Sequence, residues 1–165
     1  MKRDDLILIN EIDDMYKRDQ DIRMTGTDKE ILKVDKKNSD ILYYYVSKNG
    51  FPKQEVFGQK RFRYAITIAT HCRHNLRQQN LFVKEIELVD YRGSEQHYAT
   101  LIDSNLICKG SLQLYGTQVR IENGEIFILP TKDPKGLNRR RKKLGLEPIE
   151  AYLDGFKAYL DGLKK

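Results

Sequence analysis

Hydrophobic residues recur every three or four positions over residues 1–110, which is the spacing of amphipathic helices. Residues that end helices separate these stretches. At Asn49-Gly50, for example, the glycine can adopt a positive φ, and Pro52 then prevents the helix from continuing. The pattern predicts five helices, over residues 4–23, 28–49, 59–76, 78–91 and 95–108.

The hydrophobic spacing changes to every second position after residue 111, which is typical of β-strands. Residues 112–122 and 125–129 flank Asn123-Gly124, a pair that favours a tight type I′ turn. A two-residue loop pairs Val119 with Ile128 and places both side chains on one face. Alternation along the first strand extends that face to three polar residues, Gln113, Tyr115 and Thr117.

A short basic helix over residues 135–144 and a last helix beginning at Pro148 complete the pattern. We therefore predict a mostly α fold with one β-hairpin at 112–129, an α+β arrangement with about seven helices. The chain has 165 residues, the length of one ordinary domain, so we expect residues 1–165 to fold as a single domain.

The composition excludes several classes of protein. No run of about 18 apolar residues is present, and the apolar run 6–9 is too short for a secretory signal. The two cysteines, Cys72 and Cys108, lack the C-x-x-C spacing of a zinc site and fit a reducing compartment. We expect a cytoplasmic protein that needs no membrane, metal or cofactor.

The net charge of +6 is unevenly distributed. Residues 60–92 and residues 130–150 each hold 7 Lys/Arg against 3 Asp/Glu, and the stretch between them is nearly neutral. If the two blocks meet in space, they form a positive surface that attracts phosphates. If they do not meet, they are solvated helix faces.

No sequence motif for phosphate loops, dinucleotide binding, zinc proteases or nucleophile elbows is present. The candidates are therefore polar residues in unusual places. His71 lies at the edge of an apolar helix face, where an imidazole can serve as general acid or base or simply bind a backbone carbonyl. Asp103 lies late in its helix, where the helix dipole disfavours a carboxylate, so we expect an arginine, a histidine or buried donors to compensate.

The segment 113–118 is the most distinctive part of the sequence. Its amide, phenol and hydroxyl groups can bind a planar or phosphate-bearing ligand, or they can line a solvated edge strand. Gly116 inside a strand predicts a bulge or the close approach of another backbone. In the basic run 139–143, Arg140 shares a helix face with Leu137 and Leu144, so we expect it to point inward and clamp a phosphate or carboxylate.

Five segments occur in order along the chain: Gly50-Phe51-Pro52, Thr70-His71-Cys72, Tyr98-Ala99-x-Leu101-x-Asp103, Gln113-x-Tyr115-Gly116-Thr117-Gln118 and Asn138-x-Arg140 followed by Gly145-Leu146. This series resembles a bacterial family of unknown function with a Q-R-Y-G-T-Q signature, over about residues 19–153. The family pattern has arginine where this chain has Ser104 and Leu114. The resemblance implies no established activity.

We therefore expect a metal-independent hydrolase or transferase that acts on a phosphate-containing substrate, either RNA or a nucleotide. His71 is the predicted acid or base, oriented by Asp103, with Tyr115 as the third catalytic candidate. The predicted substrate-binding residues are Gln113, Thr117, Gln118 and Arg140. The alternative is a non-catalytic module in which the 113–118 segment grips a small molecule or a protein partner, and a toxin-type or immunity-type domain is a third hypothesis.

Overall fold

The computed structural model describes residues 2–163, and this part of the chain is mostly helical with one β-hairpin, as the sequence pattern predicts. None of the described helices has both the length and the apolar character needed to cross a membrane. The elements in chain order are α1 (Arg3–Thr25), α2 (Asp28–Asn49), α3 (Gln54–His71), α4 (Leu76–Ile86), α5 (Glu95–Cys108), β1 (Val119–Glu122), β2 (Glu125–Ile128), a 3₁₀ turn (Pro134–Gly136), α6 (Leu137–Lys143) and α7 (Ile149–Leu163).

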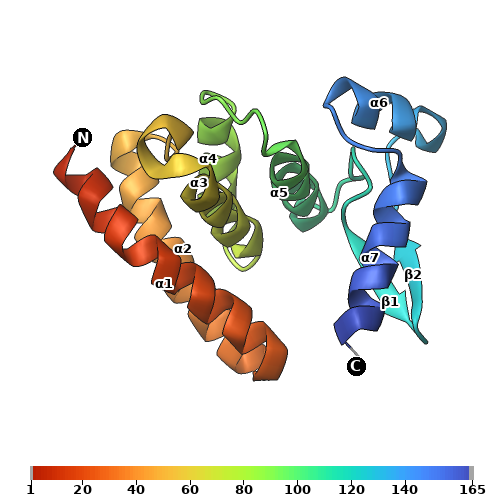
Figure 1. Cartoon of the computed structure of the whole chain (residues 1–165), viewed down its shortest axis with the longest axis horizontal. Coiled ribbons are helices and arrows are strands. Elements are labelled where there is room, and N and C mark those ends of the chain that lie inside the picture. Colours follow the sequence, from red (N-terminus) through yellow and green to blue (C-terminus); the bar gives the residue numbers. More distant parts are fainter. Residues whose placement is uncertain (1, 164–165) are drawn as a thin grey trace.

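Helices α1 to α5 pack side by side, and the hairpin, α6 and α7 lie beyond α5 at the opposite end from the N-terminus (Figure 1). The main hydrophobic core lies among α1 to α5, because each of these helices contributes its apolar face. The largest fully buried apolar side chains of this core are Phe51, Phe62, Phe82, Ile12, Met15, Leu42, Ile66, Ile68, Ile86 and Leu101.

The boundary between α3 and α4 differs from the prediction. Helix α3 ends at His71, whereas the sequence predicted a helix over 59–76, and α4 ends at Ile86 instead of residue 91. The Asn75 side chain explains the earlier end, because it accepts a hydrogen bond from the Gln78 N–H at 3.2 Å and caps α4. His71 therefore lies at the very end of α3, next to the turn.

Helices α3 and α5 run side by side in the same direction, and polar contacts join them at both ends. Arg63 Nε donates to Ser94 Oγ at 3.3 Å near the start of α5. Ser104 Oγ donates to the Thr70 carbonyl at 3.1 Å near the ends of both helices. These contacts fix the position of His71 relative to α5.

The hairpin pairs in the predicted register, with Val119 opposite Ile128 across an Asn123-Gly124 turn whose residues both have positive φ. The predicted strand over 112–118, however, is wrong. Residues 113–118 form a tight loop, in which Gly116 has a φ of 73°. Its polar side chains point in different directions instead of forming one face of a strand: Gln113 binds within the loop, whereas the Thr117 hydroxyl binds Asp103 of α5.

Candidate functional site

Asp103 organises the loop of residues 113–118. Its side chain is fully buried on α5 and accepts hydrogen bonds from the backbone N–H groups of Leu114 at 2.7 Å, Tyr115 at 3.0 Å and Thr117 at 2.9 Å. The Thr117 hydroxyl adds a further donor at 2.9 Å. We expected buried donors to compensate for the unfavourable position of this carboxylate near the end of its helix, and the N–H and hydroxyl donors of the loop confirm this.

Gln113 closes the base of the same loop. Its buried amide nitrogen donates to the carbonyls of Leu129 at 2.7 Å and Gln118 at 2.9 Å, and its amide oxygen accepts from the Gln118 N–H at 2.8 Å. These contacts use the amide internally. The structure thus places Gln113 as a brace within the loop and not on an exposed face.

Two arginines of α6 hold the loop from the other side. Arg140 Nε donates to the Leu114 carbonyl at 2.9 Å, and Arg141 Nη1 donates to the Tyr115 carbonyl at 2.6 Å. Arg140 was predicted to be the inward arginine, but Arg141 is the fully buried one. Both guanidinium groups bind protein carbonyls, and Arg140 Nη1 also lies 3.4 Å from the Asp133 carboxylate, so the carboxylate that Arg140 holds belongs to the protein itself.

The Tyr115 side chain packs against the edge of the hydrophobic core. Burial raises the pKa of its phenol, and the nearby Asp103 carboxylate adds to the effect. The neutral phenol is therefore favoured at neutral pH. Nothing in these contacts gives Tyr115 the catalytic position that the strand prediction implied.

His71 contacts a different carboxylate from the one predicted. Its Nδ1 lies 2.8 Å from Oδ1 of Asp19 on α1, whereas Asp103 binds the 113–118 loop. Arg23 Nη2 lies 3.0 Å from Asp19 and 2.5 Å from Asp35 of α2. The prediction that Asp103 orients His71 is therefore corrected: Asp19 orients the imidazole, and Arg23 links Asp19 to Asp35.

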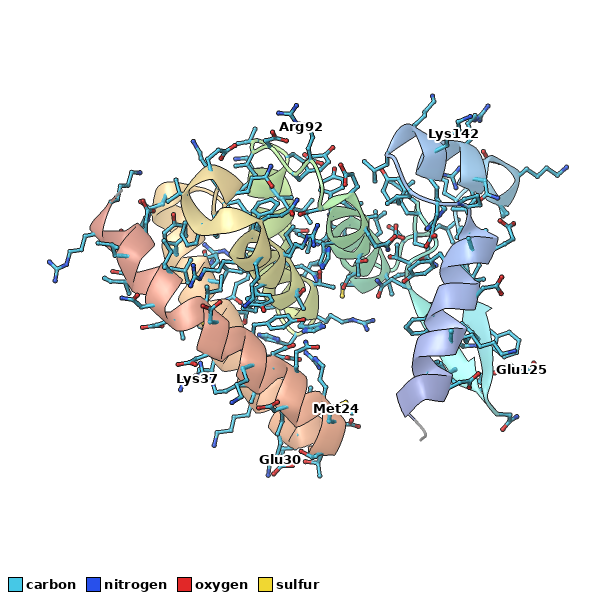
Figure 2. The ribbon with its side chains drawn as sticks, viewed as in Figure 1. Met24, Glu30, Lys37, Arg92, Glu125 and Lys142 are labelled. Carbon is cyan, nitrogen blue, oxygen red and sulfur yellow. The ribbon has the colours of Figure 1, made fainter. Side chains whose placement is uncertain are left out.

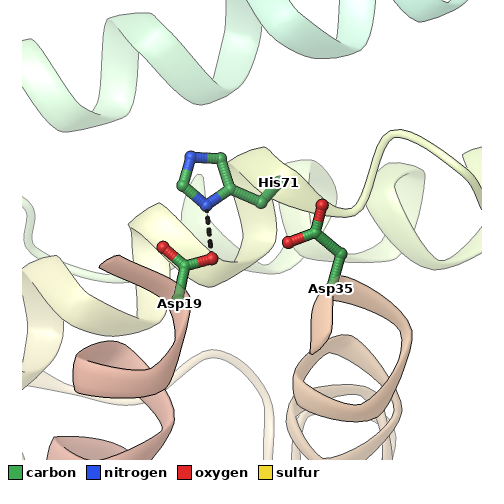
Figure 3. A group of neighbouring side chains, drawn as sticks. All are labelled: Asp19, Asp35 and His71. Atoms are coloured by element: carbon green, nitrogen blue, oxygen red, sulfur yellow. Dashed lines mark hydrogen bonds and ion pairs between the residues drawn. The ribbon is translucent and has the colours of Figure 1, made fainter. Parts of the chain in front are cut away.

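The charge of Asp19 determines the protonation of the ring nitrogen that faces it. Burial alone would raise the pKa of this carboxyl, but the hydrogen bond and charge of His71 and the charge of Arg23 outweigh it, so the pKa lies below its usual 3.8. An ionised carboxylate can only accept, so Nδ1 of His71 carries the hydrogen. Figure 3 shows the other ring nitrogen, Nε2, turned away from Asp19.

Asp19, Asp35 and His71 have ligand atoms within 4.8 Å of one another, a grouping that can hold a metal ion. Here the Arg23 guanidinium lies against both carboxylates and supplies the positive charge that a cation would bring. Burial raises the pKa of Asp35, with the charge of Arg23 opposing it. Neither aspartate was predicted from the sequence as a site residue, and metal independence stays a prediction.

His71, whose side chain is 25% exposed, lines a pocket of about 180 Å³ between α3, α5 and α7. A second hollow of about 510 Å³ adjoins it and shares Gln96, His97 and Tyr152 with it. Because the two hollows share these lining residues, we refer to them together as the groove. The residues that line the groove include Arg63, Thr67, Thr70, His71, Gln96, His97, Thr100, Gly145, Tyr152 and Phe156.

The 113–118 loop supports the walls of the groove. Gln118 Nε2 donates to the Thr100 carbonyl at 3.3 Å, and the Tyr152 hydroxyl donates to the Thr117 carbonyl at 3.4 Å. The Arg141 guanidinium lies 5.0 Å from the centre of the Tyr152 ring. Of the predicted site residues, His71 lines the groove, and Asp103, Gln113, Thr117, Gln118 and Arg140 position the loop beside it.

Comparison with known proteins gives a family but no activity. No curated protein and no solved structure matches the chain. The expectation that about residues 19–153 belong to a family of unknown function is confirmed, over a longer stretch. The chain belongs to a family of unknown function (DUF6624), whose model matches residues 6–164.

Proposed function

We propose that this protein is a metal-independent hydrolase or transferase that uses His71 as a general acid or base on a phosphate-containing substrate. The observation that carries the proposal is the His71–Asp19 contact at the wall of the groove. A buried carboxylate on Nδ1 fixes the ring orientation and leaves Nε2 for the substrate, as in other histidine–carboxylate pairs. A correctly placed acid or base contributes about 10²–10⁴ in rate.

The size of the groove suits a small ligand or part of a larger one. Its two hollows together fall within the range of about 300–1,000 Å³ that is typical of ligand sites. The hydroxyls of Thr67, Thr70 and Thr100 donate to carbonyls of their own helices, so their oxygens remain able to accept a hydrogen bond from a ligand.

Positive charge near the groove supports a phosphate-containing substrate. Arg63 lines the larger hollow together with Glu95 and Glu147, so the excess positive charge lies beside the hollow and not in its lining. Lys142 and Lys143 are exposed and lie three and two residues before Gly145, which also lines the hollow. Figure 2 shows Lys142 on α6, along the same upper edge of the view as Arg92. Cationic side chains beside a pocket raise the local concentration of anionic substrates.

The test is turnover of a panel of phosphate esters in the presence of EDTA: p-nitrophenyl phosphate, bis(p-nitrophenyl) phosphate, nucleoside triphosphates and single-stranded RNA. We expect turnover of at least one of them, with a decrease of about 10²–10⁴ in kcat for His71→Ala. Asp19→Asn decreases kcat as well, because the ring loses its orienting carboxylate.

His74→Ala is the matched control, because His74 is exposed on the turn after α3 and does not line the groove. It keeps wild-type turnover. A folded His71→Ala protein with full activity on every substrate contradicts the proposal. Activity that EDTA abolishes and a divalent cation restores contradicts metal independence. Saturable binding of a substrate without any turnover would contradict the enzyme proposal and favour a non-catalytic binding module.

A further inference from the structure

We infer that the groove cleaves RNA by attack of a ribose 2′-hydroxyl on the adjacent phosphodiester, with His97 as a second acid–base residue beside His71. This inference rests on the proposed function of His71 and goes beyond it by naming the substrate class and a second catalytic residue. Its starting point is that two histidines from neighbouring helices line the same pocket of about 180 Å³.

His97 lies in the first turn of α5, whereas His71 lies at the end of α3. His97 lines both hollows of the groove, so it lies where they join. Within residues 2–163, no side chain or backbone group makes a hydrogen bond to the His97 ring. Its ring nitrogens are therefore available to a ligand, as is Nε2 of His71.

The surroundings of the two rings assign their roles. Burial lowers the pKa of His97, and the charge of Arg63 lowers it further, so this ring is neutral at neutral pH and able to accept a proton. The groups with a charge or a titratable proton that line the groove near it are Arg63, Glu95, Glu147 and Tyr152. His71, which has Asp19 on Nδ1, then delivers the second proton.

Cleavage by this route needs one base and one acid and nothing else. A His97 ring nitrogen takes the proton from the 2′-hydroxyl as the O2′–P bond forms. The P–O5′ bond breaks, and His71, acting in its doubly protonated imidazolium form with Nδ1–H on Asp19, gives its Nε2 proton to the departing O5′. The products are a 2′,3′-cyclic phosphate and a 5′-hydroxyl end, and the step uses no water, metal or oxidant.

The larger hollow has features that suit the neighbouring nucleotides. The Tyr152 and Phe156 rings lie nearly parallel, with an angle of 13° between their planes, and both line this hollow. An aromatic surface of this kind stacks bases without strict sequence preference. Arg63 in the same hollow, and Lys142 and Lys143 beside it, favour a phosphate backbone.

The experiment uses a single-stranded RNA oligonucleotide that contains every dinucleotide step, incubated with the whole chain in EDTA. Mass spectrometry of the fragments is expected to show 2′,3′-cyclic phosphate and 5′-hydroxyl ends, and the fully 2′-O-methylated oligonucleotide stays intact. His97→Ala and His97→Gln each reduce kcat by about 10²–10⁴. Circular dichroism confirms that both variants fold.

A substrate with sulfur in place of the bridging O5′ separates the two roles, because a thiolate leaves without being protonated. This substrate restores most of the rate to His71→Ala but not to His97→Ala. His74→Ala, purified in the same way, cleaves like the wild type and shows that the variants' losses are not caused by removal of a contaminating ribonuclease.

Two results overturn the inference: cleavage of the 2′-O-methylated RNA, or full kcat in both His97 variants. The inference is also overturned if the protein turns over a nucleotide or nitrophenyl ester through His71 but leaves RNA uncleaved; the proposed function then still holds. If His71→Ala remains fully active on every substrate, the proposed function fails, and this inference fails with it.

Discussion

Replacing Asp103 by asparagine exchanges one carboxylate oxygen for an NH₂ group at the centre of the 113–118 loop. Oδ1 accepts the N–H groups of Leu114 and Tyr115, and Oδ2 accepts the N–H and hydroxyl of Thr117. If Oδ1 is replaced, the new NH₂ group faces two backbone N–H donors. If Oδ2 is replaced, it faces the Thr117 N–H, while the Thr117 hydroxyl can turn to accept from it, so at least one hydrogen bond is lost and the others lose their charged acceptor. Because Asp103 is fully buried, water cannot replace them.

The expected cost follows from these contacts. Hydrogen bonds to charged groups contribute about 1.5–3 kcal/mol each, so the loss of one or two predicts a decrease of about 1.5–6 kcal/mol in the free energy of unfolding. This is a large part of the about 5–15 kcal/mol that stabilises a typical domain. Amide hydrogen exchange in the 113–118 loop is expected to accelerate with it.

Equilibrium urea unfolding at neutral pH measures the effect for Asp103→Asn and for Asp21→Asn as the matched control. Asp21 is exposed on α1, so the same chemical change there is expected to alter stability by no more than about 0.5 kcal/mol. A decrease below about 1 kcal/mol for Asp103→Asn would refute the reasoning, because contacts that weak could not be what shapes the loop.

Two further predictions concern the loop and the His71 site. Gly116→Ala is expected to destabilise the protein by more than Gly124→Ala in thermal unfolding, since both have positive φ but only at Gly116 does an added Cβ lie 3.0 Å from Ile149 Cδ1. Asp19→Asn is expected to lower the free energy of unfolding by about 1–3 kcal/mol at neutral pH. In urea titrations at decreasing pH, that difference in unfolding free energy should disappear. The Asp19 carboxylate, whose pKa in the folded protein is below the usual 3.8, stabilises the fold at pH values above 3.8 and loses this effect as the pH falls through its folded-state pKa. A difference that stays constant with pH would contradict this prediction.

The helices and the hairpin register could be predicted because local spacing determines them. The spacing of Ile12 and Met15 identifies the buried face of α1, whichever helices pack against it. Asn123-Gly124 determines which strand residues pair. The segment 112–118 was misread for the same reason. Its alternating polar residues resemble a strand, but their hydrogen bonds go to Asp103 and to the loop itself, which local spacing does not reveal.

The partner of His71 depends on a contact across 52 residues of chain. A signal was present, since Asp19 follows Ile12 and Met15 on the buried face of α1, where an unpaired carboxylate would be unfavourable. His97 gave no comparable signal, because its importance comes from the pocket formed when α5 packs beside α3. Sequence reasoning found the unusual carboxylate Asp103 and the unusual histidine, but it paired them wrongly.

The most direct test of the central claim is the tautomer of His71, measured by long-range ¹H–¹⁵N NMR on the labelled protein above the titration range of its histidines. The account predicts that neutral His71 carries its hydrogen on Nδ1, toward Asp19, and that Asp19→Asn shifts the ring toward the Nε2–H form. Nε2–H in the wild type, or a ring unaffected by Asp19→Asn, would show that Asp19 does not hold His71 and would contradict the account.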